Sequence, residues 1–161
     1  MGKKLWEASK NKKTNSNLYA YEKFISKKFN LKLDHNYNKI LNWSIKNSGK
    51  FWSSIWDYCK IKGTKSNIEL IVSKIFYKNF FLPKSKLNFA ENLISKNNKS
   101  KALTFISENG FREERNWLEL NNNVSKIIKF FNKIKLKKND RVAAYLPNFI
   151  ETVEAFLATS S

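Results

Sequence analysis

Cysteine and histidine are almost absent from this sequence, which contains Cys59 and His35 and no second residue of either type. A lone cysteine excludes an internal disulfide framework and is typical of a reducing compartment, so we expect a cytoplasmic protein. A metal centre built from such side chains needs several of them close together. We therefore expect no metal site.

Glycine and long apolar runs are also scarce. The four glycines, Gly2, Gly49, Gly63 and Gly110, stand far apart. A loop that cradles phosphate needs several glycines close together, so that backbone amides can point at the anion. No stretch approaches the ~20 apolar residues of a membrane span. The basic start MGKKLWEASK is not followed by the apolar run of a signal peptide. The sequence thus predicts neither a nucleotide loop nor a membrane-spanning segment.

Paired catalytic side chains are missing as well. Glu113 and Glu114 are adjacent, so on a strand they face opposite sides and do not form an acid–base pair. The serine pairs Ser53–Ser54 and Ser160–Ser161 have no histidine nearby in sequence, and His35 has no evident orienting partner. We therefore assign no catalytic, cofactor-binding or metal-ligating residue.

What the sequence has in abundance is lysine. The net charge is +18, from 31 basic and 13 acidic residues, and Arg112, Arg115 and Arg141 are its only arginines. Phosphate contacts dominate nucleic-acid affinity, so a basic nucleic-acid-binding protein is one candidate function. The lysines are spread along the whole chain, however, which is more typical of solvated faces than of an interface.

Apolar residues recur at helical spacing in the first part of the chain. The expected elements are helices at Asn17–Phe29, at His35–Ile45, from a capping Ser48 onward and at Leu87–Ile94, with a short strand at Ile68–Val72. In the third helix, Phe51, Ile55 and Cys59 form one stripe, and Trp52 and Trp56 form another. Such a repeat favours core packing over a ligand-stacking surface.

The pattern changes after the polar loop Asn97–Lys101, so we divide the chain into regions 1–97 and 98–161. The expected elements are a hairpin of strands Ala102–Ser107 and Phe111–Arg115, a helix capped by Asn116 and Glu119, a strand at Arg141–Leu146, and a helix capped by Asn148 and Glu151. A strand followed by a crossover helix normally leads to a parallel neighbouring strand. The predicted fold class is therefore α/β: a helical region, a β-hairpin and an incomplete β-α-β-α block.

An ordered set of short motifs runs along nearly the whole chain: LWEAS, SNL, LNWSI, KFWSSIWDYCKI, FFLPKSKLNFAENLI, NWLEL, NDRVAAYLPN and ETVEAFLATSS. Together they resemble the amino-terminal region of acetoacetyl-CoA synthetases, within the adenylate-forming acyl-CoA synthetase superfamily. AENLI and the pairing of WSI with FW separate this group from acetyl-CoA synthetases. The sequence departs from the family at Ala8, at Phe89 and at Phe81–Lys84, where Lys84 replaces the glycine of a turn that needs positive φ.

The resemblance implies an amino-terminal fragment of an acetoacetate–CoA ligase. Such enzymes join ATP to acetoacetate or another short acyl acid, release diphosphate, and pass the acyl group to coenzyme A. ATP, coenzyme A and Mg²⁺ are therefore expected in the complete enzyme, with the remainder of the ligase chain as partner. The family's phosphate loop, ribose-binding aspartate and mobile lysine have no matching positions here, so the fragment alone is expected to be inactive. An acetyl- or propionyl-CoA synthetase fragment and an interaction module that pairs with a separately encoded remainder are the alternatives.

Overall fold

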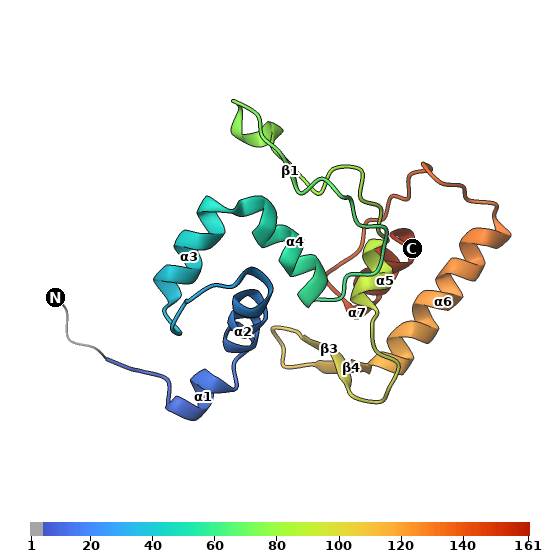
Figure 1. Ribbon diagram of the computed structural model, residues 1–161. Coiled ribbons are helices and arrows are strands. Elements are labelled where there is room, and N and C mark those ends of the chain that lie inside the picture. Colours follow the sequence, from blue (N-terminus) through green and yellow to red (C-terminus); the bar gives the residue numbers. More distant parts are fainter. Residues whose placement is uncertain (1–4) are drawn as a thin grey trace. The chain divides into compact units, whose positions relative to one another are not determined.

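The computed structural model describes residues 5–161, which form two compact units divided between Lys86 and Leu87. The first unit is mainly helical, with a small two-stranded sheet, and the second combines helices with a longer hairpin (Figure 1). This mixture of helices and small sheets agrees with the predicted helical region, hairpin and following helices. Among the described residues, none of the helices is both long and apolar enough to cross a membrane.

The first unit is built on three packed helices. Its elements are α1 (Lys10–Thr14), α2 (Asn17–Phe29), α3 (Tyr37–Lys46), α4 (Ser48–Tyr58), β1 (Leu70–Ile71), the 3₁₀ turn η1 (Phe76–Lys78) and β2 (Phe80–Phe81). The core holds Tyr21, Ile25, Leu33 and Ile40, packed against a ring of half-buried aromatic and aliphatic side chains from α2, α3 and α4. Of the α4 stripes predicted as core, Phe51 and Ile55 pack against this cluster, but Trp52 and Cys59 are exposed, so the prediction is correct only in part.

The start of α4 differs from the prediction. Ser48 is the first helical residue, and Asn47 is the cap, but no side-chain cap bond forms there. The reason is that Asn47 also ends α3: its backbone N–H donates to the Trp43 carbonyl at 2.9 Å, and its side-chain amide donates to the same carbonyl at 3.2 Å. The Asn47 amide therefore serves the carboxyl end of α3 and not the free N–H groups at the start of α4.

A short antiparallel ladder pairs Leu70 with Phe81 and Ile71 with Phe80. The predicted strand at Ile68–Val72 is thus present but shorter. In the turn that follows, Leu82 and Lys84 both have positive φ, at 47° and 67°. This confirms that Lys84 occupies a backbone conformation that favours glycine.

The second unit is organised by a hairpin and two helices. Its elements are α5 (Phe89–Leu93), β3 (Lys101–Ile106), β4 (Arg112–Asn116), α6 (Trp117–Lys133) and α7 (Ile150–Thr159). The antiparallel hairpin has an irregular register between Lys101 and Leu103. The buried core of the second unit consists of Ala90, Leu120, Val124, Leu157 and Ala158. The hairpin, its turn and the long apolar face of α6 confirm the prediction.

The two predicted capping boxes have opposite outcomes. At α6, the Asn116 side chain accepts from the Glu119 N–H and the Glu119 carboxylate accepts from the Asn116 N–H, both at 2.9 Å. At α7 no box forms. Phe149 is the cap, without a side-chain cap bond. The Glu151 carboxylate accepts instead from Arg115, a partner that local sequence does not reveal.

The strand predicted at Arg141–Leu146 is not formed. The segment makes no backbone hydrogen bond to any described residue, and Val142, Tyr145 and Leu146 are exposed. Apolar composition alone does not make a strand, because a ladder needs a neighbouring strand. Here β3 and β4 pair only with each other.

Candidate functional site

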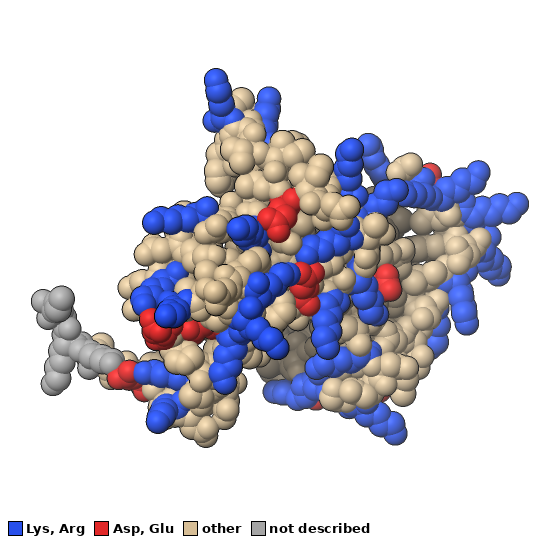
Figure 2. Space-filling view, in the orientation of Figure 1, with Lys and Arg blue, Asp and Glu red and all other residues tan. Residues whose placement is uncertain are grey.

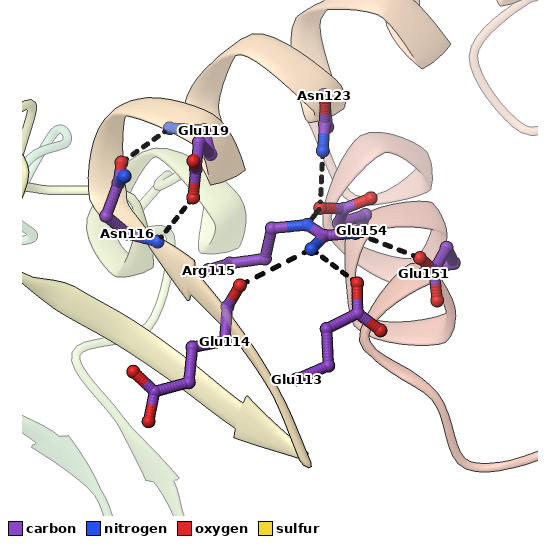
Figure 3. Close-up of polar contacts among 8 residues, drawn as sticks. All are labelled: Glu113, Glu114, Arg115, Asn116, Glu119, Asn123, Glu151 and Glu154. Atoms are coloured by element: carbon purple, nitrogen blue, oxygen red, sulfur yellow. Dashed lines mark hydrogen bonds and ion pairs between the residues drawn. The ribbon is translucent and has the colours of Figure 1, made fainter. Parts of the chain in front are cut away.

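The densest group of charged side chains surrounds Arg115 on β4 (Figure 3). Its guanidinium lies 2.5 Å from Glu113 Oε1, 3.1 Å from Glu151 Oε1 and 3.4 Å from Glu154 Oε1. Asn123 on α6 donates to the same Glu154 oxygen at 2.8 Å. We call these five residues the Arg115 cluster. It joins β4, α6 and α7 within the second unit.

The side-chain repeat of a strand and that of a helix together explain how the cluster forms. Residues two apart on a strand share a face, which places Glu113 beside Arg115. Residues three apart on a helix also share a face, which places Glu151 and Glu154 on one side of α7. Figure 3 shows the guanidinium between these two elements. The α7 carboxylates are 36 or more positions away in sequence, so folding must close a long loop before the cluster exists.

The electrostatics of the cluster favour a permanent cation. Partial burial of Arg115 acts to lower the pKa of its guanidinium, but the hydrogen bond to Glu113 and the charges of Glu113, Glu154 and Glu151 raise it overall. Glu154 is only 4% exposed, so its carboxylate depends on this cation and on Asn123. A guanidinium held in this way stays protonated. The cluster is therefore built to fix elements in place, not to transfer protons.

The opposite face of the hairpin carries a separate ion group. Glu114 accepts from Lys101 at 2.6 Å and from Arg112 at 2.7 Å, and these hydrogen bonds hold the pKa of its carboxyl below the usual range. Glu113 and Glu114 thus bind different cations on different faces. The two adjacent side chains therefore face opposite sides of the strand, as its period predicts.

His35 has an orienting partner that the sequence did not reveal. The buried Glu22 carboxylate accepts from the His35 backbone N–H at 2.8 Å and lies 3.1 Å from its Nδ1. The imidazole also packs on Tyr19, with ring centroids 4.4 Å apart. Asp34 and His35 both have positive φ, which is a strained backbone conformation. The hydrogen bond to Glu22 therefore stabilises a strained turn. A helical residue facing a turn 13 positions away gives no local signal.

This histidine–carboxylate pair borders a cavity of about 400 Å³. Ser16 lines the same cavity, but its hydroxyl donates to the Lys13 carbonyl at 2.7 Å and accepts from the Tyr19 N–H at 3.2 Å. A nucleophile requires a hydroxyl within reach of the base and free to react. The arrangement at His35 therefore supports the turn and does not activate a nucleophile.

The serine pairs are engaged in helix packing. Ser54 is fully buried; its hydroxyl donates to the Phe51 carbonyl at 2.7 Å and lies 2.7 Å from the Tyr21 hydroxyl. Ser160 and Ser161 each donate to a carbonyl of α7 at 2.8 Å. Neither pair contacts His35. Cys59 is exposed.

The residues present do not match the needs of a phosphate-bound metal. Among residues 5–161, no group of three or more His, Cys, Asp or Glu side chains could hold a metal ion.

A cavity of about 670 Å³ in the second unit is lined by the ends of α6 and α7 and by the segment 136–142. Its lining is mixed polar and apolar and includes Ser160 and Ser161.

Comparison with known proteins shows to which proteins this chain is similar, which the geometry of the clusters does not reveal. No family model matches the sequence. An acetoacetyl-coenzyme A synthetase from Rhizobium meliloti is 34% identical over 125 residues, which is 78% of this chain and 19% of that enzyme. The chain is homologous to acetoacetyl-CoA synthetases. A malonamoyl-CoA synthetase from Penicillium aethiopicum is 29% identical over 98% of this chain and 22% of its own length.

The fold comparison agrees with the homology to acetoacetyl-CoA synthetases. The structure of acetoacetyl-CoA synthetase from Streptomyces lividans superposes with a TM-score of 0.85 at 20% identity, over 99% of this chain and 25% of that one. The resemblance read from the motifs is thereby confirmed. The chain spans about a fifth of the length of the curated relatives it matches.

Proposed function

We propose that this chain is the amino-terminal scaffold of an acetoacetate–CoA ligase, which converts ATP, acetoacetate and coenzyme A to acetoacetyl-CoA, AMP and diphosphate. The observation that supports this most strongly is the 34% identity to the Rhizobium meliloti enzyme over 78% of the chain. The chemistry would belong to residues outside these 161, with ATP, coenzyme A and Mg²⁺ bound there. The chain alone is expected to be inactive and cytoplasmic.

The role of this part would be to position later elements. Arg141–Leu146 is exposed and makes no backbone hydrogen bonds to the described residues, so it is suited to pair with a further strand. The Arg115 cluster holds α7 against the hairpin directly after that segment. We keep 1–97 and 98–161 as proposed functional regions, the second being the start of the AMP-binding domain. α5 packs with the second compact unit although it precedes that boundary.

A chimera tests the proposal directly. The matched segment of the Rhizobium meliloti enzyme is replaced by this chain, and acetoacetate-dependent exchange of diphosphate into ATP is measured, followed by thioester formation. We expect activity in the chimera and none in the chain alone. The equivalent graft from the Xenopus tropicalis enzyme, which is 34% identical to this chain over 78% of it, serves as the control. A folded chimera that is inactive beside an active control graft would refute the scaffold role.

The same chimera bears on the acyl substrate. Acetoacetate is the first expectation because most of the matched relatives carry that name, whereas the Penicillium relative is named for malonamoyl-CoA. Acetate, propionate and acetoacetate are compared at equal concentration. A profile unchanged from that of the parent enzyme would place substrate choice outside this chain, as the scaffold role predicts.

The +18 charge supports a second candidate, binding to nucleic acid. Figure 2 shows lysine and arginine side chains distributed over the whole visible face, interspersed with few acidic groups. Counterion release would make such binding fall steeply with salt. Fluorescence anisotropy with labelled duplex DNA and RNA at rising salt decides the point. The scaffold role predicts weak binding that is lost at physiological ionic strength.

A further inference from the structure

A group of exposed apolar side chains in the first unit lies at the tip of its hairpin, residues 72–80, which we call the tip segment. Phe76 is 89% exposed, Tyr77 79%, Val72 74% and Phe80 60%. Figure 1 shows this segment extending from β1 away from α3 and α4 of the same unit. Scattered apolar residues are normal on a surface, but four within nine positions at one tip form a patch.

The tip segment is ordered by its own polar contacts. Ser73 N–H donates to the Asn79 side chain at 2.7 Å, Ile75 N–H to the Ser73 hydroxyl at 3.1 Å, and Lys78 N–H to the Ile75 carbonyl at 2.9 Å. The rings are therefore not needed to hold the loop together. Because these backbone donors are satisfied within the loop, the exposed apolar side chains are the groups that the tip offers to a partner. Arg141–Leu146 presents the reverse case, with unpaired backbone.

The charge around the tip selects the kind of apolar partner. Between Glu69 and Glu91 the sequence has four lysines and no acidic residue. Lys74 and Lys78 flank the two most exposed rings of the tip segment and have no carboxylate partner among the described residues. In Figure 2 the tip, at the top of the view, carries blue side chains among tan ones. Aromatic rings favour the membrane–water boundary, and lysine favours anionic headgroups beside it.

We propose that the tip segment docks the protein onto anionic membrane surfaces. Phe76 and Tyr77 enter the boundary between headgroups and acyl chains, while the ammonium groups of Lys74 and Lys78 lie at the lipid phosphates. The contact is peripheral and reversible, because a few side chains at one tip insert far less apolar surface than a spanning helix. This role is independent of the ligase proposal, since it uses no residue of the Arg115 cluster.

Vesicle co-sedimentation of the 161-residue chain tests the proposal. Binding is measured to phosphatidylcholine vesicles and to vesicles with added phosphatidylserine, at low and at near-physiological ionic strength. We expect binding only with phosphatidylserine and a decrease as salt rises. Phe76→Ser with Tyr77→Ser is expected to weaken partitioning at least about tenfold. Lys74→Gln with Lys78→Gln should weaken it about fivefold for each lysine removed.

Matched control variants distinguish vesicle binding through the tip segment from non-specific binding by other exposed residues. Tyr37→Ser changes an exposed ring on α3, and Lys126→Gln with Lys129→Gln removes two exposed charges on α6. Both controls should bind vesicles like the parent chain. Hydrogen exchange with and without vesicles should show protection confined to residues 72–80. Equal loss in the control variants, or binding to phosphatidylcholine alone, would overturn the proposal.

Two other occupants of the tip give distinct results. Light scattering would detect a dimer that the Phe76→Ser and Tyr77→Ser changes abolish, and this would assign the tip to a second copy of the chain. In the Rhizobium chimera, protection of residues 72–80 without any lipid would assign the tip to an intramolecular contact with the rest of the enzyme. Either outcome replaces the membrane assignment.

Discussion

The two units hold a buried carboxylate in different ways. In the first unit Glu22 accepts from the His35 backbone N–H at 2.8 Å and lies 3.1 Å from the His35 Nδ1, and the buried hydroxyl pair of Tyr21 and Ser54 is neutral. In the second unit the core is aliphatic, and the buried polar group is the Glu154 carboxylate, which depends on Arg115. Packing is tolerant of small shifts, whereas a buried ion cluster requires all of its partners. The second unit should therefore be the more sensitive to losing a single charge.

The largest expected effect comes from the first core. Ile25 is fully buried, so Ile25→Ala should lower the free energy of unfolding by about 3 kcal/mol through lost burial and a residual cavity. Urea unfolding measures the loss. Hydrogen exchange should rise in α2, α3 and α4 and stay unchanged in α6. Leu18→Ala, at an exposed site on α2, is the control, with an effect within about 0.5 kcal/mol. Equal destabilisation of α6 would show that the units do not respond separately.

Removing the cluster cation should be nearly as costly. Arg115→Met leaves Glu154 buried with only Asn123 as partner, and a loss of about 2 kcal/mol is expected because Arg115 is itself partly exposed. Adding Glu154→Gln should recover part of this loss, which a double-mutant cycle measures. Arg112→Met removes the exposed arginine of the same strand and should change stability by less than about 0.5 kcal/mol. Similar losses for the two arginines would contradict the dependence of the buried Glu154 carboxylate on Arg115.

These contrasts also explain how far the sequence could predict the structure. The bounds of α2 and the capping box of α6 were predicted correctly because both depend on residues within one or two turns. The same local rule was wrong at α7, where Glu151 binds Arg115 instead of its own helix end. It was also wrong at Arg141–Leu146, since a strand is defined by its neighbour.

The site residues follow the same logic. That Glu113 and Glu114 face apart was predictable from the period of a strand. The pairing of Glu22 with His35, and of Arg115 with Glu151 and Glu154, depends on tertiary packing. No local spacing encodes contacts of that kind, so composition and motifs alone could not reveal them.

A middle-sized effect tests the neutral hydroxyl pair of the first unit. Tyr21→Phe removes one hydrogen bond but leaves the Ser54 hydroxyl bonded to the Phe51 carbonyl, so a loss of about 1 kcal/mol is expected. Tyr58→Phe is the matched control, because its hydroxyl bond to the Asn17 carbonyl is exposed. Thermal unfolding of both variants gives the comparison. If Tyr21→Phe lowered the free energy of unfolding by more than Arg115→Met does, the neutral hydroxyl pair of the first unit would matter more than the ion cluster of the second.

The two asparagines at the helix starts offer a paired test within the second unit. Asn116→Ala should cost about 1 kcal/mol because it breaks a formed capping box. Asn148→Ala should cost much less, since α7 has no side-chain cap bond. Urea unfolding of the pair is sufficient. Equal losses would mean that the Asn148 side chain stabilises α7 in solution.

The smallest effect concerns pH. Burial acts to raise the pKa of Asp57, but hydrogen bonds from Lys28 and Lys65 lower it overall. A carboxyl whose folded pKa is depressed contributes stability above its unfolded pKa of about 3.9, and this contribution is lost as pH falls through the folded value. Asp57→Asn should therefore be less stable than the parent at neutral pH, by under about 1 kcal/mol for a partly exposed pair.

The stability difference between the parent chain and Asp57→Asn should close in acid, as measured by urea midpoints over that pH range. Arg115 provides the contrast from the second unit. Its pKa is raised by ionised glutamates, so its contribution is present where those carboxylates are charged and does not fade at neutral or moderately alkaline pH. An Asp57→Asn difference that persisted at the lowest pH would mean that packing, and not charge, carries the role of Asp57. The pair of Glu22 and His35 would then be the remaining ionic contact near the core of the first unit that the structure describes.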